Sequence, residues 1–375
     1  MTSGVSAGSL TESPLAEAVD LLAKAAELVS VSSVSYQEAD IASLIEARLR
    51  QNPSLDVHRV GDNVLARTQL GKPSRLLIGG HSDTVPPNGN AAARIVGDVL
   101  WGLGACDMKS ALAVMLELAA ASEEPDMDVT WLFYAREEVR IADSGLRELF
   151  ADCPELLAAD AAILGEPTGG AVEAGCQGTM RAVVTLAGER AHTARPWMGR
   201  NAIHRLGVLL GLVDAYKPRT PTLDGCEFRE SLQAVAVAGG VAGNVVPDKA
   251  SVTLGYRYAP DRSATQAEAA LFEMLGPALG SDDTVEVTEH APAAAPGLQH
   301  QLLQRLITDN NLEVRAKLGW TDVAFFAERG IPAVNFGPGD ATLAHTAEER
   351  VDRASLESYY GCLQALLFPV KNTAL

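Results

Sequence analysis

The sequence predicts an α/β protein in which a mostly parallel sheet carries helices on both faces and is interrupted by a smaller α+β unit. Short apolar runs alternate with helical patterns along the first part of the chain, as is typical of parallel strands joined by helices. The middle of the chain changes to the order β-α-β-β-α-β, which is the ferredoxin-like arrangement. Near the end the first pattern resumes, so we expect the middle unit to be inserted into a larger domain.

The larger domain begins with two helical patterns, at residues 14–30, where Pro14 stands near the start, and at residues 36–50. The first dozen residues are rich in Ser, Thr and Gly, and we expect them to form a loose tail. An apolar helix is expected at residues 109–121. The expected strands are residues 64–67, 76–79, 129–134 and 161–164.

The inserted unit is expected to span residues 176–291. Its expected strands are residues 180–187, 231–238, 251–258 and 284–288, and its expected helices are residues 200–216 and 265–279. Gly175 and the Pro/Ala-rich residues 292–296 mark its two boundaries. The larger domain therefore takes residues 1–175 and 292–375, and it ends with a strand at 314–317, a helix from Asp322 and a strand at 333–336.

Composition excludes several classes of function. The net charge of −18 disfavours nucleic acids and anionic membranes as partners, because their phosphates need a basic face. The five cysteines are odd in number, widely spaced and without a C-x-x-C pair, which favours a reducing compartment, the cytoplasm. No apolar stretch approaches the length of a membrane span, and the first 13 residues do not form a secretory signal.

The motif G-G-H-S-D-T-V-P at residues 79–86 places His81 and Asp83 two residues apart at the end of an apolar run. Positions i and i+2 of a strand project to one face. A histidine that binds a metal usually gives its second ring nitrogen to a carboxylate, so this pair supplies both parts. The alternative is an ordinary surface hydrogen bond.

Four further acidic or imidazole sites stand where an expected strand ends or a helix begins: Asp107, the pair Glu137 and Glu138, Glu166, and His345. Each also has a simpler explanation, such as a helix N-cap for Asp107, a solvated turn for the Glu pair, or a surface loop for the last two. In a metal hydrolase, one carboxylate of the pair can hold the ion while its neighbour takes a proton from water.

Together these residues predict a metal centre, because ligands bind at the carboxyl ends of the strands in open α/β sheets. Imidazole and carboxylate donors suit zinc, with cobalt or manganese able to substitute. Six such groups are too many for one tetrahedral ion, and they fit two ions about 3.5–4 Å apart that share a carboxylate.

The motifs, in order, resemble those of the co-catalytic zinc hydrolases, a family that includes aminoacylase-1, glutamate carboxypeptidase, acetylornithine deacetylase and succinyl-diaminopimelate desuccinylase. The matching motifs are G-G-H-S-D-T-V-P, G-x-G-A-C-D-M-K-S, R-E-E, G-E-P-T and F-G-P-G-D-A-T-L-A-H. The resemblance implies two zinc ions per subunit, one held by His81 and Glu166, the other by Glu138 and His345, with Asp107 bridging. It also implies that Asp83 orients His81, that Glu137 is the general base, and that the Asp107–Met108 peptide is cis.

Residues 174–181, 190–196, 243–248 and 319–323 look most like one branch of the desuccinylases. This likeness implies hydrolysis of N-succinyl-LL-2,6-diaminopimelate to succinate and LL-2,6-diaminopimelate, a step of lysine and diaminopimelate biosynthesis. A substrate with three carboxylates needs cations and donors beyond the metal, and arginine suits this need. The candidates are Arg257, Asn244, Arg195 and Thr321. The alternative for Arg257 is a strand-surface charge, and Arg195 is further expected to supply a charge that many desuccinylases carry near Gln177.

The resemblance also implies that His192 of the inserted unit reaches the partner subunit's active site as an oxyanion donor. It therefore implies a homodimer through the inserted unit, which then serves as a dimerisation and lid domain. The alternative is a histidine that caps the following helix. Two rival functions remain open: another N-acyl-amino-acid amidohydrolase or carboxypeptidase of the same fold, such as acetylornithine deacetylase, and a metal-binding protein without catalysis.

Overall fold

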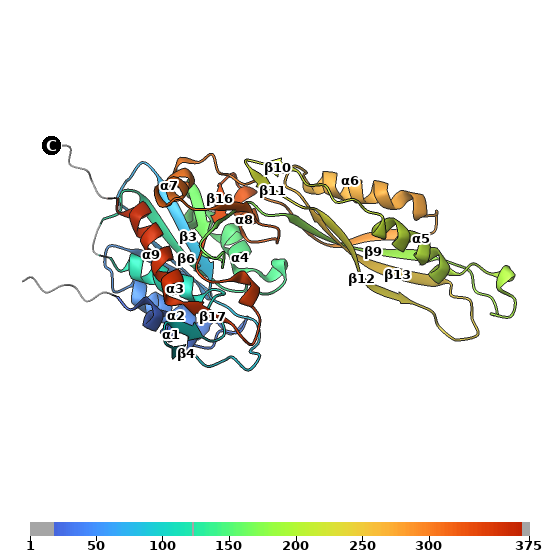
Figure 1. Cartoon of the computed structure of the whole chain (residues 1–375), viewed down its shortest axis with the longest axis horizontal. Helices are drawn as coiled ribbons and strands as arrows, with labels where there is room; N and C mark the ends of the chain where they lie inside the picture. Colours follow the sequence, from blue (N-terminus) through green and yellow to red (C-terminus); the bar gives the residue numbers. More distant parts are fainter. Residues whose placement is uncertain (1–18, 122–123, 370–375) are drawn as a thin grey trace, which may run out of the picture.

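The computed structural model describes residues 19–121 and 124–369, and it has two parts (Figure 1). One part is built on an eight-stranded sheet. The other is an elongated four-stranded sheet that extends away from it and carries helices α5 and α6 on one face. The expected residues 14–18 of the first helix and the expected N-terminal tail lie outside the described residues.

The larger sheet has the strand order β1-β2-β6-β3-β7-β16-β8-β15. Its centre, β6-β3-β7-β16, is parallel, whereas β1 and β2 are antiparallel at one edge and β16 pairs antiparallel with β8 near the other. The strands are β1 (Asp56–Val60), β2 (Asn63–Arg67), β3 (Arg75–His81), β6 (Asp128–Tyr134), β7 (Ala161–Leu164), β8 (Val172–Ala174), β15 (Val314–Ala316) and β16 (Ala333–Asn335).

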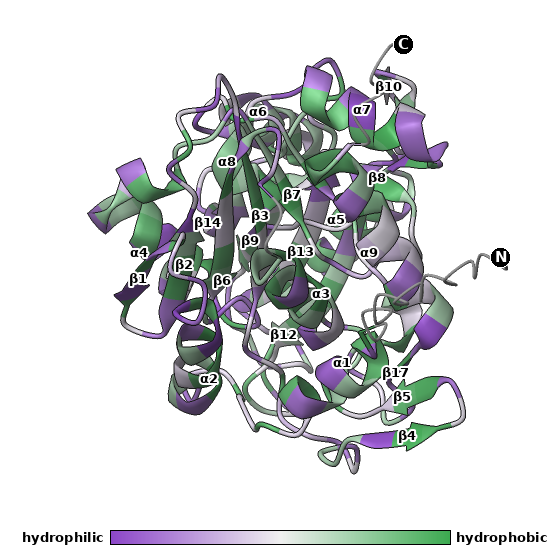
Figure 2. Cartoon of the chain, turned by 90° about the vertical axis from the view of Figure 1, so that its left-hand side faces the viewer, coloured by the Kyte–Doolittle hydropathy of each residue, from purple (hydrophilic) through white to green (hydrophobic). Residues whose placement is uncertain are grey.

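Helices cover both faces of this sheet. Neighbouring residues of a strand point to opposite faces, so Leu76 and Ile78 of β3 pack into one core and Leu77 packs into the other. The first core contains α1 (Leu21–Val29), α2 (Ala39–Leu49), α3 (Lys109–Ala119), α7 (Gln301–Asn310) and α9 (Arg353–Leu367). The second contains α4 (Gly145–Asp152) and α8 (Val323–Ala327). Figure 2 shows hydrophobic strands at the centre and hydrophilic residues on the outer turns of the surrounding helices.

The four-stranded sheet is antiparallel and has the order β12-β13-β9-β14. Its elements follow one another as β9 (Gly178–Ala187), α5 (Ala202–Asp214), β12 (Ser231–Gly239), β13 (Lys249–Tyr258), α6 (Ala264–Leu275) and β14 (Thr284–Ala291). The predicted β-α-β-β-α-β order is therefore confirmed. Both helices pack on the same face and enclose a core of their own, separate from the two cores of the larger sheet.

The elements that the sequence did not predict are mostly short. Strands β4 (Arg94–Val96), β5 (Val99–Trp101) and β17 (Arg350–Asp352) form a small sheet, and β10 (Thr222–Leu223) and β11 (Cys226–Glu227) form a two-residue ladder. Strand β8, edge strand β1 and helices α4, α7 and α9 were also missed. Within the described residues, every helix is too short or too polar to cross a membrane.

Candidate metal centre

The parallel strands end at one edge of the sheet, and the candidate ligands follow those ends. In the register of β3 and β6, His81 lies opposite Tyr134, and Gly79 of β3 lies opposite Leu164, the last residue of β7. The chain therefore places His81, the Glu137–Glu138 pair and Glu166 at the same edge. The loop that leads into α3 adds Asp107, and the loop after β16 adds His345.

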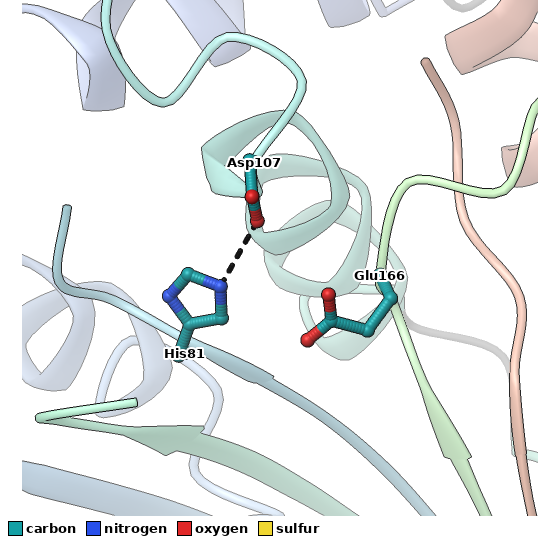
Figure 3. Close-up of side chains that lie close together, drawn as sticks. All are labelled: His81, Asp107 and Glu166. Carbon is teal, nitrogen blue, oxygen red and sulfur yellow. Dashed lines mark hydrogen bonds and ion pairs between the residues drawn. The ribbon is translucent and has the colours of Figure 1, made fainter. Parts of the chain in front are cut away.

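His81, Asp107 and Glu166 converge on one point (Figure 3). The Nε2 atom of His81 lies 3.1 Å from Oδ1 of Asp107, and the carboxylate of Glu166 points toward this pair. Glu166 is buried, and its Oε1 atom has no hydrogen-bond partner among the described residues. A buried carboxylate oxygen without a partner is costly, so its surroundings fit a bound cation. The surface-loop alternative for Glu166 is wrong.

A second group forms around His345. Its Nε2 atom lies 2.7 Å from Oε1 of Glu138 and 3.4 Å from Oδ2 of Asp107. Asp107 thus contacts one imidazole with each of its oxygens. Met108, not Asp107, is the N-cap of α3, so the helix-cap alternative for Asp107 is wrong. The Asp107–Met108 peptide is cis, as the resemblance implies.

Three triads of these residues each bring their ligand atoms within 4.8 Å of one another: His81–Asp107–Glu166, His81–Glu137–Glu138 and Asp107–Glu138–His345. The first and third of these triads share only Asp107. Asp107 therefore lies where a carboxylate that bridges two ions would lie. Two imidazoles and several carboxylates are also the donor set that dinuclear hydrolase centres use. The residues therefore fit a pair of metal ions.

In the metal-free site, the close contacts between imidazoles and carboxylates, together with burial, shift the pKa values of the candidate ligands. Burial alone would lower the pKa of His81, but the carboxylates of Asp107 and Asp83 raise it well above its usual value. Hydrogen bonds to Asp107 and Glu138 raise the pKa of His345 to about 10. Burial, followed by the charge of Asp107, raises the pKa of Glu166 to about 7. Bound metal ions would displace these protons, because ligand atoms must be deprotonated.

Asp83 is fully buried, and it holds the loop that carries Glu137 and Glu138. The backbone N–H groups of these two residues donate to its carboxylate at 2.9 and 3.1 Å. Asp83 contacts His81 as expected, but not from the same strand, because β3 ends at His81 and Asp83 lies in the following loop. The Nδ1 atom of His81 is 3.1 Å from the Asp83 carbonyl oxygen and 3.5 Å from its carboxylate.

Glu137 extends into the centre beside its neighbouring ligand candidates. Burial raises the pKa of Glu137 well above its usual value, and the charges of Asp322 and Glu166 add to this effect, although His81 opposes it. A carboxylate with a raised pKa beside a metal centre is suited to accept and return a proton. The solvated-turn alternative does not describe this residue.

Three predicted residues lie far from this centre in the same chain. His192, Asn244 and Arg195 are exposed and gather beyond the end of β9, where the Thr193 N–H donates to the Asn244 carbonyl. The near end of β9 adjoins the larger domain, and its ten residues span about 30 Å. Gln177 precedes the near end, so Arg195 does not occupy its surroundings within one chain. The N-cap of α5 is Asn201, so the capping alternative for His192 is wrong.

Arg257 and Thr321 lie at the junction of the two parts. The Cys176 thiol donates to the Thr321 carbonyl at 3.6 Å, and Arg257 pairs with Thr179, three residues after Cys176, in the register of β13 and β9. The Nη1 atom of Arg257 and the hydroxyl of Thr321 are buried without a partner among the described residues. Arg257 is therefore half-buried at the junction and is not a free surface charge.

Sequence reasoning missed several buried residues around the centre. The carboxylate of Asp322 is buried next to Tyr134, and burial raises its pKa to about 7. Glu349 accepts hydrogen bonds from the N–H groups of Cys106 and Asp107 at 3.2 Å. Lys109 is buried and donates to the Val31 carbonyl at 2.7 Å. A charged residue inside an apolar stretch was the one available signal, and it applied to Lys109 alone.

Two curated relatives match most of the chain. A protein of Mycobacterium tuberculosis provisionally named succinyl-diaminopimelate desuccinylase DapE is 49% identical over 343 residues, which cover 91% of this chain and 96% of the relative. The succinyl-diaminopimelate desuccinylase of Corynebacterium glutamicum is 45% identical over 331 residues, covering 86% and 89%.

Two solved structures share the fold. The aminopeptidase PepT from Bacillus cereus has a TM-score of 0.76 at 19% identity, covering 93% of this chain and 97% of that one. The YXEP protein of Bacillus subtilis, described as a dinuclear metal binding peptidase from the M20 family, has a TM-score of 0.67 at 16% identity, covering 92% and 96%.

The sequence pattern of peptidase family M20/M25/M40 matches residues 77–368, a stretch that includes every candidate metal ligand. This match agrees with the fold, with the inserted sheet and with the candidate dinuclear centre. The chain therefore belongs to peptidase family M20/M25/M40 and is a metal-dependent amidohydrolase.

Proposed function

We propose that this protein hydrolyses N-succinyl-LL-2,6-diaminopimelate to succinate and LL-2,6-diaminopimelate, and so acts in lysine and diaminopimelate biosynthesis. The observation that carries the proposal is the identity of 49% and 45% with two relatives that bear the desuccinylase name, over at least 86% of the chain. The candidate centre supports the chemistry, because the candidate metal ligands and the candidate general base converge at one sheet edge.

Zinc is the proposed metal, with cobalt or manganese able to substitute. His81 and Glu166 would hold one ion, Glu138 and His345 the other, and Asp107 both. When bound, the ions supply Lewis-acid polarisation of the scissile carbonyl and acidify the attacking water. The orphaned oxygen of Glu166 and the central position of Asp107 support this division of ligands.

The chain's own residues then carry the proton. Glu137 accepts a proton from the attacking water and passes it to the leaving amine, for which its raised pKa is suited. Asp83 fixes the loop of Glu137 and faces His81. His192 of the partner subunit donates to the oxyanion that develops on the succinyl carbonyl.

The substrate's carboxylates require donors outside the metal centre. Arg257 and Thr321 are proposed to bind one of them within the same chain, since their unpartnered polar atoms lie at the junction of the two parts. Asn244 and Arg195 are proposed to act from the partner subunit together with His192. Arg195 can therefore supply the positive charge missing near Gln177 only to the active site of the partner subunit.

The proposed homodimer forms through the inserted sheet. Strand β12 is an edge of this sheet and pairs only with β13 among the described residues. Its nine residues carry no charge, and Val235 and Val237 are 58% and 57% exposed. Natural edge strands usually carry charges that block pairing, so an apolar edge supports pairing with a second copy. The five cysteines are buried and free, which supports a reducing compartment, the cytoplasm.

A substrate panel tests the proposed reaction. Purified protein with two equivalents of Zn²⁺ is assayed with N-succinyl-diaminopimelate, N-acetylornithine and dipeptides. We expect kcat/KM for the succinylated substrate to exceed the others by at least about 100-fold, because donors built for a carboxylate reject substrates that leave them unpaired. A preference for the acetylated substrate or the peptides would replace this function by the corresponding rival, and zinc-dependent hydrolysis of any of them would exclude a catalytically inactive protein.

A further inference from the structure

The loop that carries Glu137 is held by side chains instead of by a backbone ladder. Its four consecutive N–H groups, from Ala135 to Glu138, all donate to side-chain oxygens. The acceptors in order are Oδ1 of Asn63, Oε1 of Glu38, and Oδ1 and Oδ2 of Asp83, at 2.9, 3.1, 2.9 and 3.1 Å. Buried backbone donors must find acceptors, so the path of this loop depends on those three side chains.

Glu38 is the unexpected member of this set. It is fully buried at the N-cap position of α2, yet its side chain makes no capping bond with that helix. Its carboxylate accepts instead from Arg136, almost 100 residues along the chain. Arg136 has a φ of 59°, which is uncommon for a residue other than glycine and persists where surrounding contacts determine it.

Ser35 acts on the same loop through Asp83. Its hydroxyl donates to Oδ2 of Asp83 at 2.7 Å, the oxygen that also accepts from Glu138. The segment around Ser35 is itself fixed, because Val34 forms a parallel bridge with Thr84 and the Ser33 hydroxyl donates to the Ser82 carbonyl at 2.7 Å. Residues 33–38 therefore connect the loop after β3 with the loop after β6.

We infer that Ser35 and Glu38 are positioning residues for the general base. They act through Asp83 and Arg136 on the backbone of Glu137 and Glu138, and neither belongs to the candidate ligand groups. A displacement of a catalytic group by about 1 Å can cost about 100-fold in rate, so a loop without ladder bonds needs such supports. The inference rests on the proposed role of Glu137, and it adds a requirement that the metal ligands alone do not meet.

The first test measures kinetics of the metal-loaded protein with whichever amide of the panel it hydrolyses. We expect Glu38→Ala to lower kcat by about 10–100-fold with KM and metal content little changed, in line with other supports of metal sites. Glu38→Gln keeps the acceptor oxygen for Arg136, and we expect its kcat within about threefold of the parent. Ser35→Ala, which removes one of three donors to Asp83, is expected to lower kcat by about 3–10-fold.

Matched controls come from the same segment. Asp40 is an exposed acidic residue in the first turn of α2, and Ser32 is an exposed serine three residues before Ser35. Asp40→Ala and Ser32→Ala are expected to leave kcat unchanged. A rise in KM with unchanged kcat, or an equal loss in Glu38→Ala and Glu38→Gln, would overturn the positioning role.

The second test needs neither substrate nor metal. Amide hydrogen exchange is measured on a peptide covering residues 130–140 in the metal-free protein. We expect Glu38→Ala and Ser35→Ala to speed exchange at residues 136–138 by about tenfold, while Glu38→Gln and the two controls do not. Unchanged exchange in Glu38→Ala would overturn the inference even if the reaction is the proposed one. Faster exchange in a protein that does not hydrolyse the succinylated substrate would refute only the proposed function.

Discussion

Asp107 is the residue on which the candidate centre depends most. Each of its oxygens contacts a different imidazole, and it belongs to both groups of ligands. Hydrogen bonds to His345 and His81 keep its pKa below its usual value although burial opposes them. A carboxylate that stays ionised while buried is ready to hold two cations. Glu137 differs, because burial favours its protonated form, and one site thus contains carboxylates suited to two roles.

Glu137→Ala separates these roles. If Glu137 is the base and not a ligand, the variant keeps two metal ions per subunit, and its kcat falls by about 100–10,000-fold, the usual contribution of general base catalysis. Metal content by emission spectroscopy and kcat under saturating substrate measure both quantities. Glu138→Ala is the matched control and is expected to lose metal as well as activity. A Glu137→Ala enzyme that retains a tenth of the parent's kcat would refute the assignment of the base.

At the scale of the elements, the sequence predicts the strands and helices that have several apolar residues at a regular spacing. It does not predict short strands or the burial of single polar side chains, which depend on contacts between distant parts of the chain. The apolar runs predict β3, β6 and β7, and because parallel strands end at one edge, the sequence also predicts that His81, Glu138 and Glu166 lie together. Three-residue strands such as β4 and β5 carry too few positions for a period to appear. The sequence indicates only a helix start at Asp322 and does not distinguish Glu349, since only the fold shows that both are buried.

The attachment of α5 to β14 gives a prediction for stability. Arg205 on α5 donates to Asp283, the residue before β14, and the N–H groups of Ala187 and Gly280 donate to the same carboxylate. Burial would raise the pKa of Asp283, but these bonds lower it to about 2 from the usual 3.8. Because the folded state favours the charged form, this stabilisation is present above about pH 4 and is lost as the pH falls toward 2.

Asp283→Asn is therefore expected to lower the free energy of unfolding by about 1.5–3 kcal/mol at pH 7, the usual range for a buried hydrogen bond to a charged group. The difference from the parent should shrink between pH 4 and pH 3. Urea unfolding followed by circular dichroism at pH 7, 5, 4 and 3 measures it. Asp282→Asn, at the exposed neighbour, is expected to cost less than about 0.5 kcal/mol. A penalty that stays constant with pH would show that the charge of Asp283 is not responsible.

At the scale of the whole molecule, the inserted sheet extends away from the larger sheet (Figure 1). His192, Asn244 and Arg195 lie in the exposed loops beyond the far end of β9. The sequence motifs single out these residues but do not show where they lie, because the order of residues in one chain does not reveal how two subunits are arranged. The proposed symmetric dimer would account for both their distance from the centre and the apolar edge of β12.

The edge of β12 can be tested directly. Val237→Lys puts a charge on the exposed edge, as natural edge strands do, and we expect it to convert a dimer into a monomer while the fold is kept. Sedimentation velocity measures the oligomeric state and circular dichroism the fold. Ile95→Lys, at an exposed apolar residue of the small sheet, is the control and should leave the dimer intact. A Val237→Lys protein that remains dimeric would place the interface elsewhere.

Donation of His192 across the dimer predicts recovery of activity in mixed dimers. His192→Ala should lower kcat by about 100–1,000-fold, as loss of an oxyanion donor does, and Glu137→Ala is expected to lose about 100–10,000-fold. In a mixed dimer, the subunit with His192→Ala keeps its base and receives His192 from its partner, so one of two sites is complete. Co-expression with two affinity tags yields purified mixed dimers, which are expected to reach about half of the parent's kcat per dimer. In this mixture, one of the two sites has both Glu137 and a donated His192.

The control is a mixed dimer of Glu137→Ala and Glu138→Ala. It should stay inactive, because each subunit then lacks one residue of its own metal centre and neither site is complete. If mixed dimers of His192→Ala and Glu137→Ala remain as slow as His192→Ala alone, His192 acts within its own chain or not at all.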